Sequence, residues 1–176
     1  MEQKPKTVSP ISNEGRNAYV AAHLTSALRE LLKEHQLADI SISELCDGAG
    51  VGRTSFYRNF ETKEDILKGY IERLFHGWMD MWNNNPGLPL DKGVYNVFSH
   101  FEANREFYAL LNERGQVYLM KDIILELCGF NPDQDPIPAY SSAYVAFFLY
   151  GWIEVWFRRG MRETAELSAL LRERGN

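Results

Sequence analysis

Apolar residues recur along most of this chain at the spacing of an α-helix. Leu24, Leu28 and Leu32 share one face of a predicted helix, because residues three or four positions apart are neighbours on a helix. The cleanest apolar stripe consists of Ile66, Leu67, Tyr70, Ile71, Leu74, Phe75, Trp78 and Trp82. Prolines are absent from residues 11–85, 90–131 and 139–176, and proline is excluded from helix interiors. The pattern predicts an all-α protein.

Capping residues and glycines set the expected ends of the helices. Ser41 with Glu44, and Thr62 with Asp65, form predicted capping boxes. Gly50 begins a tight turn between two short helices. The expected helices span residues 14–35, 41–49, 53–59, 63–82, 139–159 and 164–172, and three more start near Asp91, Asn104 and Val117. We expect a flexible arm at 1–13 and a proline-containing loop at 129–138.

Composition places the chain among soluble globular proteins. Of its 176 residues, 45% are hydrophobic and 24% are charged, which is ordinary for a folded domain. Cys46 and Cys128 make neither a disulfide framework nor a CxxC metal site, so we expect a reducing compartment. We also expect both thiols to be buried in the core. The uncharged segment 137–153 is too short and polar to favour a membrane span. No secretory signal is expected at 1–15, so a cytoplasmic location is predicted.

The charge of the chain narrows the choice of partner. A net charge of −5 argues against a general polyanion binder. The segment 52–63 nevertheless carries Arg53, Arg58 and Lys63 against Glu61 alone, a local balance of +2. Any contact with nucleic acid is therefore expected to be concentrated on this segment.

Two short helices joined by a glycine-containing turn, after a longer helix, suggest a helix-turn-helix. A small shared core can be formed by Leu45, Ala49, Val51, Phe56 and Phe60. The surface then receives Arg53, Thr54, Ser55, Tyr57, Arg58 and Asn59. A helix with Arg, Thr and Ser near its start can reach base edges in a major groove. Lys63 and nearby backbone N–H groups suit a phosphate.

The residues of this segment also carry a family resemblance. Residues 42–67 read ISELCDGAGVGRTSFYRNFETKEDIL and contain the pattern AGV-x-R-x-x-FY-x-x-F-x-x-KE-x-(I/L)-L. The segment resembles the DNA-binding region of the TetR family of bacterial transcriptional regulators, and the likeness extends over about residues 14–75. Gly52 departs from the family pattern, which usually has Ser or a similar capping residue there.

The resemblance implies a homodimer of all-helical subunits that binds double-stranded DNA at a palindromic operator. Residues 14–62 would form the DNA-binding domain, and residues 63–176 would bind a small-molecule effector and dimerise, with 63–82 as the connecting helix. Base contacts would come from Arg53, Thr54 and Ser55. Phosphate contacts would come from Ser41, Ser43, Tyr57, Asn59 and Lys63. A repressor released from DNA by its effector is the expected activity.

Aromatic residues concentrate after residue 75, where all four tryptophans lie. A predicted apolar effector pocket is lined by Trp78, Trp82, Phe101, Tyr118, Tyr144, Phe148 and Trp152. The plainer interpretation, a simple hydrophobic core, also remains open for these residues. The segment 139–157 is apolar nearly all round, so it needs cover on a second side. We expect it to form a dimer seam with the last helix.

Other functions are weighed against this one. A TetR-like fold that acts as a coactivator or scaffold stays open, because the first 75 residues carry little net charge. An all-α enzyme is not expected, since the sequence shows no acid–base pair and no nucleophile motif. The glycines of residues 48–52 follow a capped helix rather than a strand, so they do not indicate a phosphate loop. The four histidines lack metal-ligand spacing, and no metal or cofactor is predicted.

Overall fold

The computed structural model describes residues 13–83 and 90–162, with side chains described from Glu14 and omitted at 79–83 and 90–96. The described residues form α-helices, one short 3₁₀-helix and turns, which confirms the all-α prediction. The chain divides into two compact units, Met1–Ile66 and Leu67–Asn176. The division falls inside one continuous helix, α4 (Lys63–Asn83).

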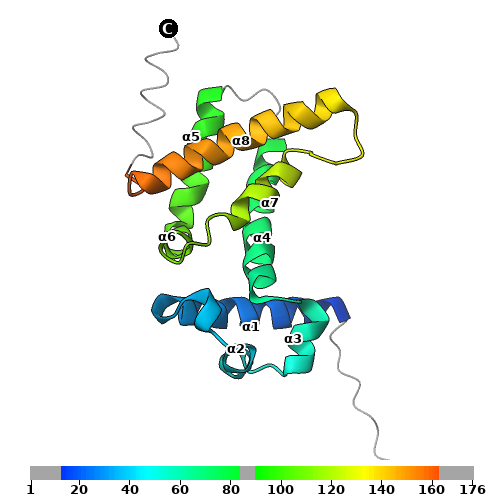
Figure 1. Cartoon of the computed structure of the whole chain (residues 1–176), viewed down its shortest axis with the longest axis vertical. Helices are drawn as coiled ribbons and strands as arrows, with labels where there is room; N and C mark the ends of the chain where they lie inside the picture. The colour runs from blue at the N-terminus through cyan, green and yellow to red at the C-terminus, as the bar shows by residue number, and fades with distance from the viewer. Residues whose placement is uncertain (1–12, 84–89, 163–176) are drawn as a thin grey trace, which may run out of the picture. The chain divides into compact units, whose positions relative to one another are not determined.

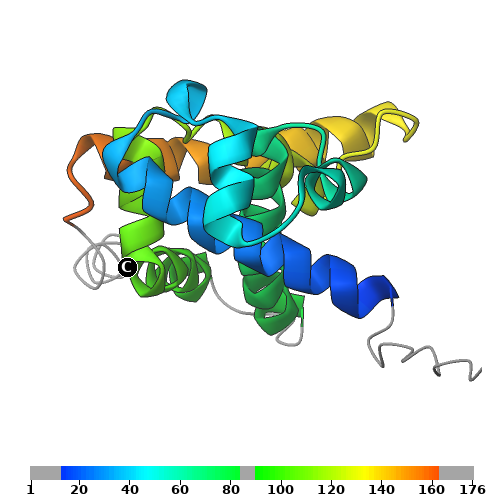
Figure 2. The ribbon, with the colours of Figure 1, turned by 90° about the horizontal axis from the view of Figure 1, so that it is seen from below.

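The first unit is built on the long helix α1 (Asn13–Glu34). A short 3₁₀-helix, η1 (Leu37–Asp39), leads to α2 (Ile42–Ala49) and α3 (Arg53–Asn59). Helices α2 and α3 pack against α1 and against each other (Figures 1 and 2). Three leucines of α1 on one face are completely buried, as are Leu45 of α2 and Phe56 of α3. The predicted core of the helix-turn-helix is therefore present, with Val51 and Phe60 half-buried at its edge.

Both predicted capping boxes are present. The amide N–H of Glu44 donates to Ser41 Oγ at 3.1 Å, and the amide N–H of Ser41 donates to the Glu44 carboxylate at 3.4 Å. At the start of α4, the amide N–H of Asp65 donates to Thr62 Oγ1 at 3.2 Å. In return, the amide N–H of Thr62 donates to Asp65 Oδ2 at 2.8 Å. These bonds satisfy backbone donors that have no partner within their helices.

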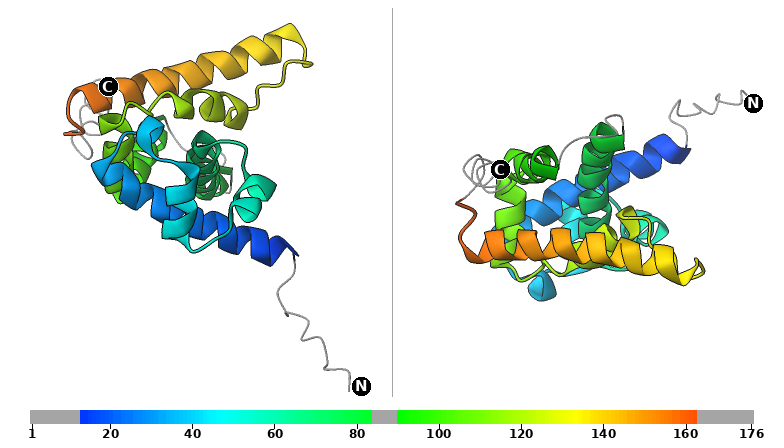
Figure 3. Two further views of the ribbon diagram at one scale, coloured as in Figure 1. Left: turned by 60° about the horizontal axis from the view of Figure 1, so that its bottom comes forward. Right: turned by 90° about the horizontal axis from the view of Figure 1, so that it is seen from above.

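The described part of the second unit contains the rest of α4 and four further helices. These are α5 (Leu90–Ala103), α6 (Arg105–Glu113), α7 (Leu119–Leu127) and α8 (Pro136–Arg158). Helix α7 packs along α8 (Figure 3), and α5 contacts α6. The core is aromatic: Phe101 contacts the rings of Tyr108, Trp156 and Phe157, with centroids 4.3, 5.7 and 6.2 Å away.

The structure corrects two details of the predicted helices. Helix α8 begins at Pro136 rather than at residue 139, because prolines are tolerated in the first helical turn, where the N–H groups need no intrahelical acceptor. Asn104 precedes α6 but does not cap it. Its side-chain amide instead donates to the carbonyl of His100 at 2.9 Å, near the end of α5. The predicted arm at 1–13 and helix at 164–172 lie outside the residues with described side chains.

Candidate functional site

Helix α3 has one buried face and one exposed face. Phe56 points into the core with no exposed surface, and its ring meets the ring of Tyr57 edge-on, with centroids 5.1 Å apart. Arg53, Thr54 and Arg58 are exposed, and Tyr57 has 60% of its surface exposed. Ser55 is half-buried at the border of the two faces. Of the three predicted base-contacting residues, Arg53 and Thr54 are therefore exposed at the start of α3, where a partner can reach them.

The turn before α3 depends on Gly50. Its φ of +64° lies in the left-handed region, a backbone conformation that residues with a Cβ rarely adopt. Its amide N–H donates to the carbonyl of Asp47, and the next residue, Val51, donates to Cys46 at 3.0 Å. Gly52 then precedes α3 without a side-chain cap, and its carbonyl accepts from Ser55 at 2.8 Å. The turn thus directs the chain from α2 into α3 through backbone bonds alone.

Ser41 and Ser43 lie at the start of α2, and both are exposed. Ser41 Oγ already accepts the capping bond described above, but a hydroxyl can also donate. Ser43 lies within the first turn. The geometry leaves both hydroxyls able to donate to a phosphate oxygen, and their predicted contact stays a prediction.

Two residues predicted to contact phosphate find partners within the protein instead. The side-chain amide of Asn59 donates to the carbonyl of Ser55 at 2.7 Å, so its N–H₂ group is turned toward its own helix. The ammonium of Lys63 donates to the carbonyls of Leu37 and Ile40. Both side chains are half-buried. The structure therefore does not place these two donors with Arg53 and Tyr57 on the exposed face of α3.

The predicted effector residues fall into two groups. Phe101 has no exposed surface and Trp78 is buried, whereas Tyr144 has 75% of its surface exposed. Tyr118 and Phe148 are exposed as well, and Trp152 is half-buried between the rings of Phe98 and Phe148. Residues so different in exposure do not surround one enclosed cavity. The side chain of Trp82 lies outside the described residues.

Beside Phe101 lies a polar pair that sequence reasoning missed, the half-buried His100 and the buried Tyr108. His100 Nε2 and the Tyr108 hydroxyl are 2.8 Å apart, and the His100 ring lies beside the rings of Phe75 and Phe101. Burial lowers the pKa of His100 to about 4 and raises the pKa of Tyr108 well above its usual value. The spacing of eight residues crosses a helix boundary, so no periodic pattern indicates the pair.

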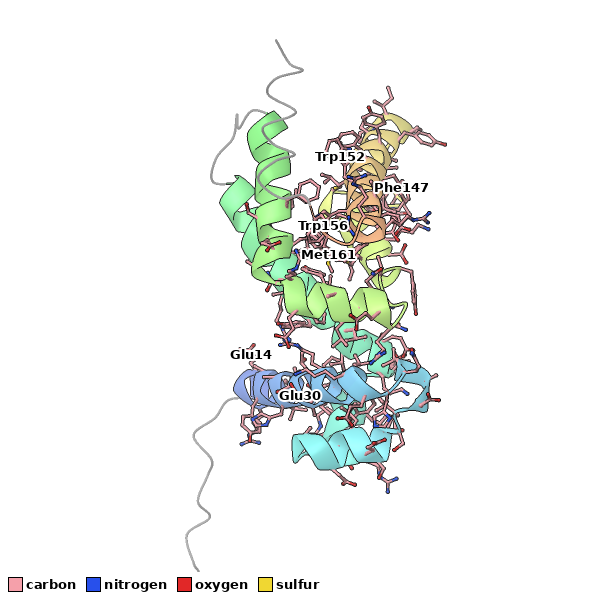
Figure 4. The ribbon with its side chains drawn as sticks, turned by 90° about the vertical axis from the view of Figure 1, so that its left-hand side faces the viewer. Glu14, Glu30, Phe147, Trp152, Trp156 and Met161 are labelled. Atoms are coloured by element: carbon pink, nitrogen blue, oxygen red, sulfur yellow. The ribbon has the colours of Figure 1, made fainter. Side chains whose placement is uncertain are left out.

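The indole of Trp156 adds a second polar feature to this core. Trp156 is only 2% exposed, and its Nε1 has no hydrogen-bond partner among the described residues. In the side-chain view, Trp152 and Trp156 project from α8, whereas Phe147 projects from its opposite side (Figure 4). A buried N–H donor without an acceptor is rare and calls for an explanation.

The outer face of α8 carries exposed apolar residues. Ile137, Tyr144, Phe148 and Val155 follow one another at steps of seven, four and seven residues, with Gly151 between the last two. At about 100° per residue, these positions lie on one stripe along the helix. A shallow depression at the start of α8 is lined by Pro136, Ile137, Tyr140, Ser141, Tyr144 and Val145.

The described residues show little that favours metal or thiol chemistry. They bring together no group of three or more His, Cys, Asp or Glu that could hold a metal ion. Burial raises the pKa of both thiols; Cys46 is buried, and Cys128 is half-buried rather than buried as predicted. No helix in the described part of the chain is long and apolar enough to cross a membrane.

Comparison with known proteins identifies the first unit. Residues 24–70 match the sequence profile described as "Bacterial regulatory proteins, tetR family". This segment of the chain is similar to the tetR family. It covers α2, α3 and the turn between them, together with the second half of α1 and the start of α4. The tetR-family match therefore includes every residue of the exposed α3 face.

Curated relatives of the tetR-family segment are named as transcriptional regulators and not as enzymes. AlkX of Mycobacterium tuberculosis is 27% identical over 62% of this chain and 52% of its own length. YxbF of Bacillus subtilis, named as uncharacterized, is 26% identical over 82% of this chain and 41% of its own length. EthR of Mycolicibacterium smegmatis is 31% identical over 48% of this chain and 42% of its own length. The chain therefore spans about half or less of the length of these relatives.

Solved structures share the fold of the whole chain. Lin0861 from Listeria innocua has a TM-score of 0.68 at 15% identity and covers 98% of this chain and 94% of its own. A TetR transcriptional regulator from Streptococcus agalactiae has a TM-score of 0.50 at 19% identity and covers 80% of this chain and 85% of its own. At such low identities the likeness shows that the fold is shared, an N-terminal helix-turn-helix followed by a helical domain.

Proposed function

We propose that this chain is a transcriptional regulator that binds double-stranded DNA through the exposed face of α3. The observation that carries the proposal is the division of α3 between a buried Phe56 and an exposed Arg53, Thr54 and Tyr57. A helix held to its own domain by one face can enter a major groove with the other. The match of residues 24–70 to the tetR family supports this use of the helix.

The residues of the surface divide by the chemistry that they offer. Arg53, Thr54 and Ser55, at the start of α3, would contact base edges. Tyr57, Ser41 and Ser43 would donate to backbone phosphates, which position the protein without reading sequence. Arg58 is exposed on the same face and adds a second cation that the predicted set does not include.

The stripe on α8 supports a homodimer. Exposed tyrosine, phenylalanine, isoleucine and valine side chains on one helix face indicate a surface that is covered in the assembled protein. A two-fold dimer presents two α3 helices to DNA, so its operator would be palindromic, with half-sites about one helical turn apart. The regulator would act in the cytoplasm, where the operator is.

The second unit would bind a small, mainly apolar effector that releases the protein from DNA. Its aromatic core supports an aromatic or apolar ligand, and Trp156 Nε1 offers such a ligand one donor. The effector would shift the dimer between two separations of its α3 helices, which is a coupling between two distinct sites.

Selection of genomic fragments by the purified protein tests the proposal. We expect enrichment of a short palindrome that the Arg53→Ala variant binds 10-fold or more weakly, because a good base contact contributes about 1–3 kcal/mol of discrimination. Tyr57→Phe removes one hydroxyl and is expected to weaken binding several-fold. Arg162→Ala, which removes an exposed arginine of the second unit, serves as the matched control.

The outcome also separates the regulator from the scaffold interpretation. A folded wild-type protein that enriches no fragment at low salt would exclude operator binding, because phosphate contacts are strongest there. Capture of protein partners would then test a coactivator or scaffold. Equal loss of binding in Arg53→Ala and Arg162→Ala would show that α3 is not the reading helix.

A further inference from the structure

Lys63, the first residue of α4, contacts a segment that lies far before it in the sequence. Its ammonium donates hydrogen bonds to the backbone carbonyls of Leu37 and Ile40. Both carbonyls belong to the connector, residues 36–41, which joins α1 to α2. Because α2 and α3 lie between Ile40 and Lys63 in the chain, these bonds close the whole helix-turn-helix segment into a loop.

The connector is held from two directions. The side chains of Leu37 and Ile40 are buried in the core of the first unit, and the carbonyls of the same two residues meet the ammonium. An ammonium has three N–H donors, so two bonds to carbonyls leave at most one for any other group. Hydrogen bonds from a charged donor are stronger than those between neutral groups, so moving Lys63 to a phosphate would give up two strong bonds.

The electrostatics of the position agree with an internal role. A cation at the start of a helix is opposed by the helix dipole. Here the ammonium bonds to the carbonyl oxygens of the connector. Glu64 and Asp65 add negative charge to the first turn of α4, where the helix dipole favours it. The connector ends at Ser41, the capping residue of α2, so a fixed connector also fixes where α2 begins and, through the Gly50 turn, where α3 points.

We propose that Lys63 is a positioning residue that clasps the connector and holds α2 and α3 in place, and that it does not bind DNA phosphate. The structural part of this inference concerns the first unit alone. Its consequence for DNA binding rests on the proposed function.

Amide hydrogen exchange in the full chain tests the clasp without DNA. In Lys63→Met the amides of Asp39, Ser41 and Glu44, which are bonded within or next to the connector, are expected to exchange at least 10-fold faster. Lys33→Met removes an exposed lysine of the same unit that pairs with Glu30 and is expected to leave these amides unchanged. Lys63→Arg keeps a cationic donor and is expected to retain more protection than Lys63→Met.

The salt dependence of DNA binding tests the second half of the proposal, with the fragment enriched in the selection above as the probe. Each lost phosphate contact lowers the slope of log K against log salt by about 0.9. Lys63→Met is expected to bind several-fold more weakly with the slope of the wild type. A shallower slope, or unchanged exchange of the connector amides, would overturn the proposal. If the wild type enriches no fragment, the regulator proposal fails while the exchange result still decides the clasp.

Discussion

The hydroxyl of Tyr108 lies 2.8 Å from Nε2 of His100, inside the aromatic core of the second unit. The rings around His100 are those of Phe75, Trp78 and Phe101. None of these neighbours can stabilise an imidazolium as a carboxylate would, which is why burial lowers the pKa of His100 to about 4. The core thus holds a histidine that stays neutral in the folded protein at pH values where an exposed histidine is charged.

This relationship predicts that acid weakens the second unit. An unfolded histidine titrates near pH 6.5, so between about pH 6.5 and 4 the unfolded chain binds a proton that the folded chain excludes. The contribution of neutral His100 to the free energy of unfolding is therefore fully present above about pH 6.5. It is lost as the pH falls toward 4. We expect His100 to account for about 1–2 kcal/mol of the loss between pH 7.5 and 5.

Urea unfolding followed by tryptophan fluorescence measures this effect, because all four tryptophans lie in the second unit. The His100→Gln variant should lose less stability between pH 7.5 and 5 than the wild type does. The exposed His35 lies in the first unit, so His35→Gln provides a control for the His-to-Gln change itself. Equal pH dependence in His100→Gln and the wild type would contradict a half-buried histidine that stays neutral.

Replacing Ser41 or Ser43 by alanine is predicted to have different effects on the stability of the first unit, although the two serines are two residues apart and both exposed. Ser41 caps α2 through its hydroxyl, and replacing such a residue by alanine costs about 1 kcal/mol. Ser43 makes no capping bond, so Ser43→Ala should change the stability of the first unit by less than about 0.5 kcal/mol. Thermal unfolding followed by circular dichroism compares the two variants, and equal losses would show that the capping box contributes nothing.

Much of the fold follows from local signals that the sequence displays directly. The capping boxes at Ser41 and Thr62 and the turn at Gly50 each depend on residues within four positions of one another, and each is found where it is predicted. Asn104 shows the limit of such reasoning. Its amide has a backbone carbonyl of the preceding helix within reach, and that nearby acceptor is used in place of the cap.

In the candidate site, too, some residues could be placed from the sequence and others could not. The exposed face of α3 follows from helical periodicity around Phe56, so Arg53 and Tyr57 could be placed from the sequence alone. The partners of Lys63 are 26 and 23 residues away, and no sequence spacing predicts such a contact. The predicted effector residues do not surround one enclosed cavity for a related reason. Periodicity predicts which residues share a helix face, but it does not predict which other helix packs on that face.

Gly50 is predicted to be sensitive to substitution for a backbone reason alone. Apart from its two chain neighbours, no described residue lies within 4 Å of the position that a Cβ would take, so steric overlap with these residues is not the reason. The left-handed backbone nevertheless disfavours alanine by about 1–2 kcal/mol, whereas asparagine tolerates it better. Gly50→Ala should therefore lower the melting temperature of the first unit more than Gly50→Asn does. The reverse order in calorimetry would indicate that the turn relaxes to another conformation.

Gly151 offers a test of the dimer surface that separates assembly from folding. It lies on the apolar stripe of α8, and a Cβ there would have no described atom within 4 Å apart from the backbone of its own helix and its chain neighbours. Gly151→Leu should therefore leave the protomer folded, with a gain of up to about 1 kcal/mol in helix propensity. On a packed helix–helix seam, however, the added side chain would occupy space that belongs to the partner and weaken the dimer at least 10-fold.

The matched control for Gly151 is Gly77, in the middle of α4. It is exposed and equally open around the position of a Cβ, so Gly77→Leu makes the same chemical change and the same gain in helix propensity. Sedimentation velocity over a range of protein concentrations compares the two variants with the wild type. Dissociation in Gly151→Leu but not in Gly77→Leu would assign the seam to α8. Dimers of unchanged strength in both would place the subunit interface elsewhere, because a close helix–helix contact at residue 151 has no room for a leucine.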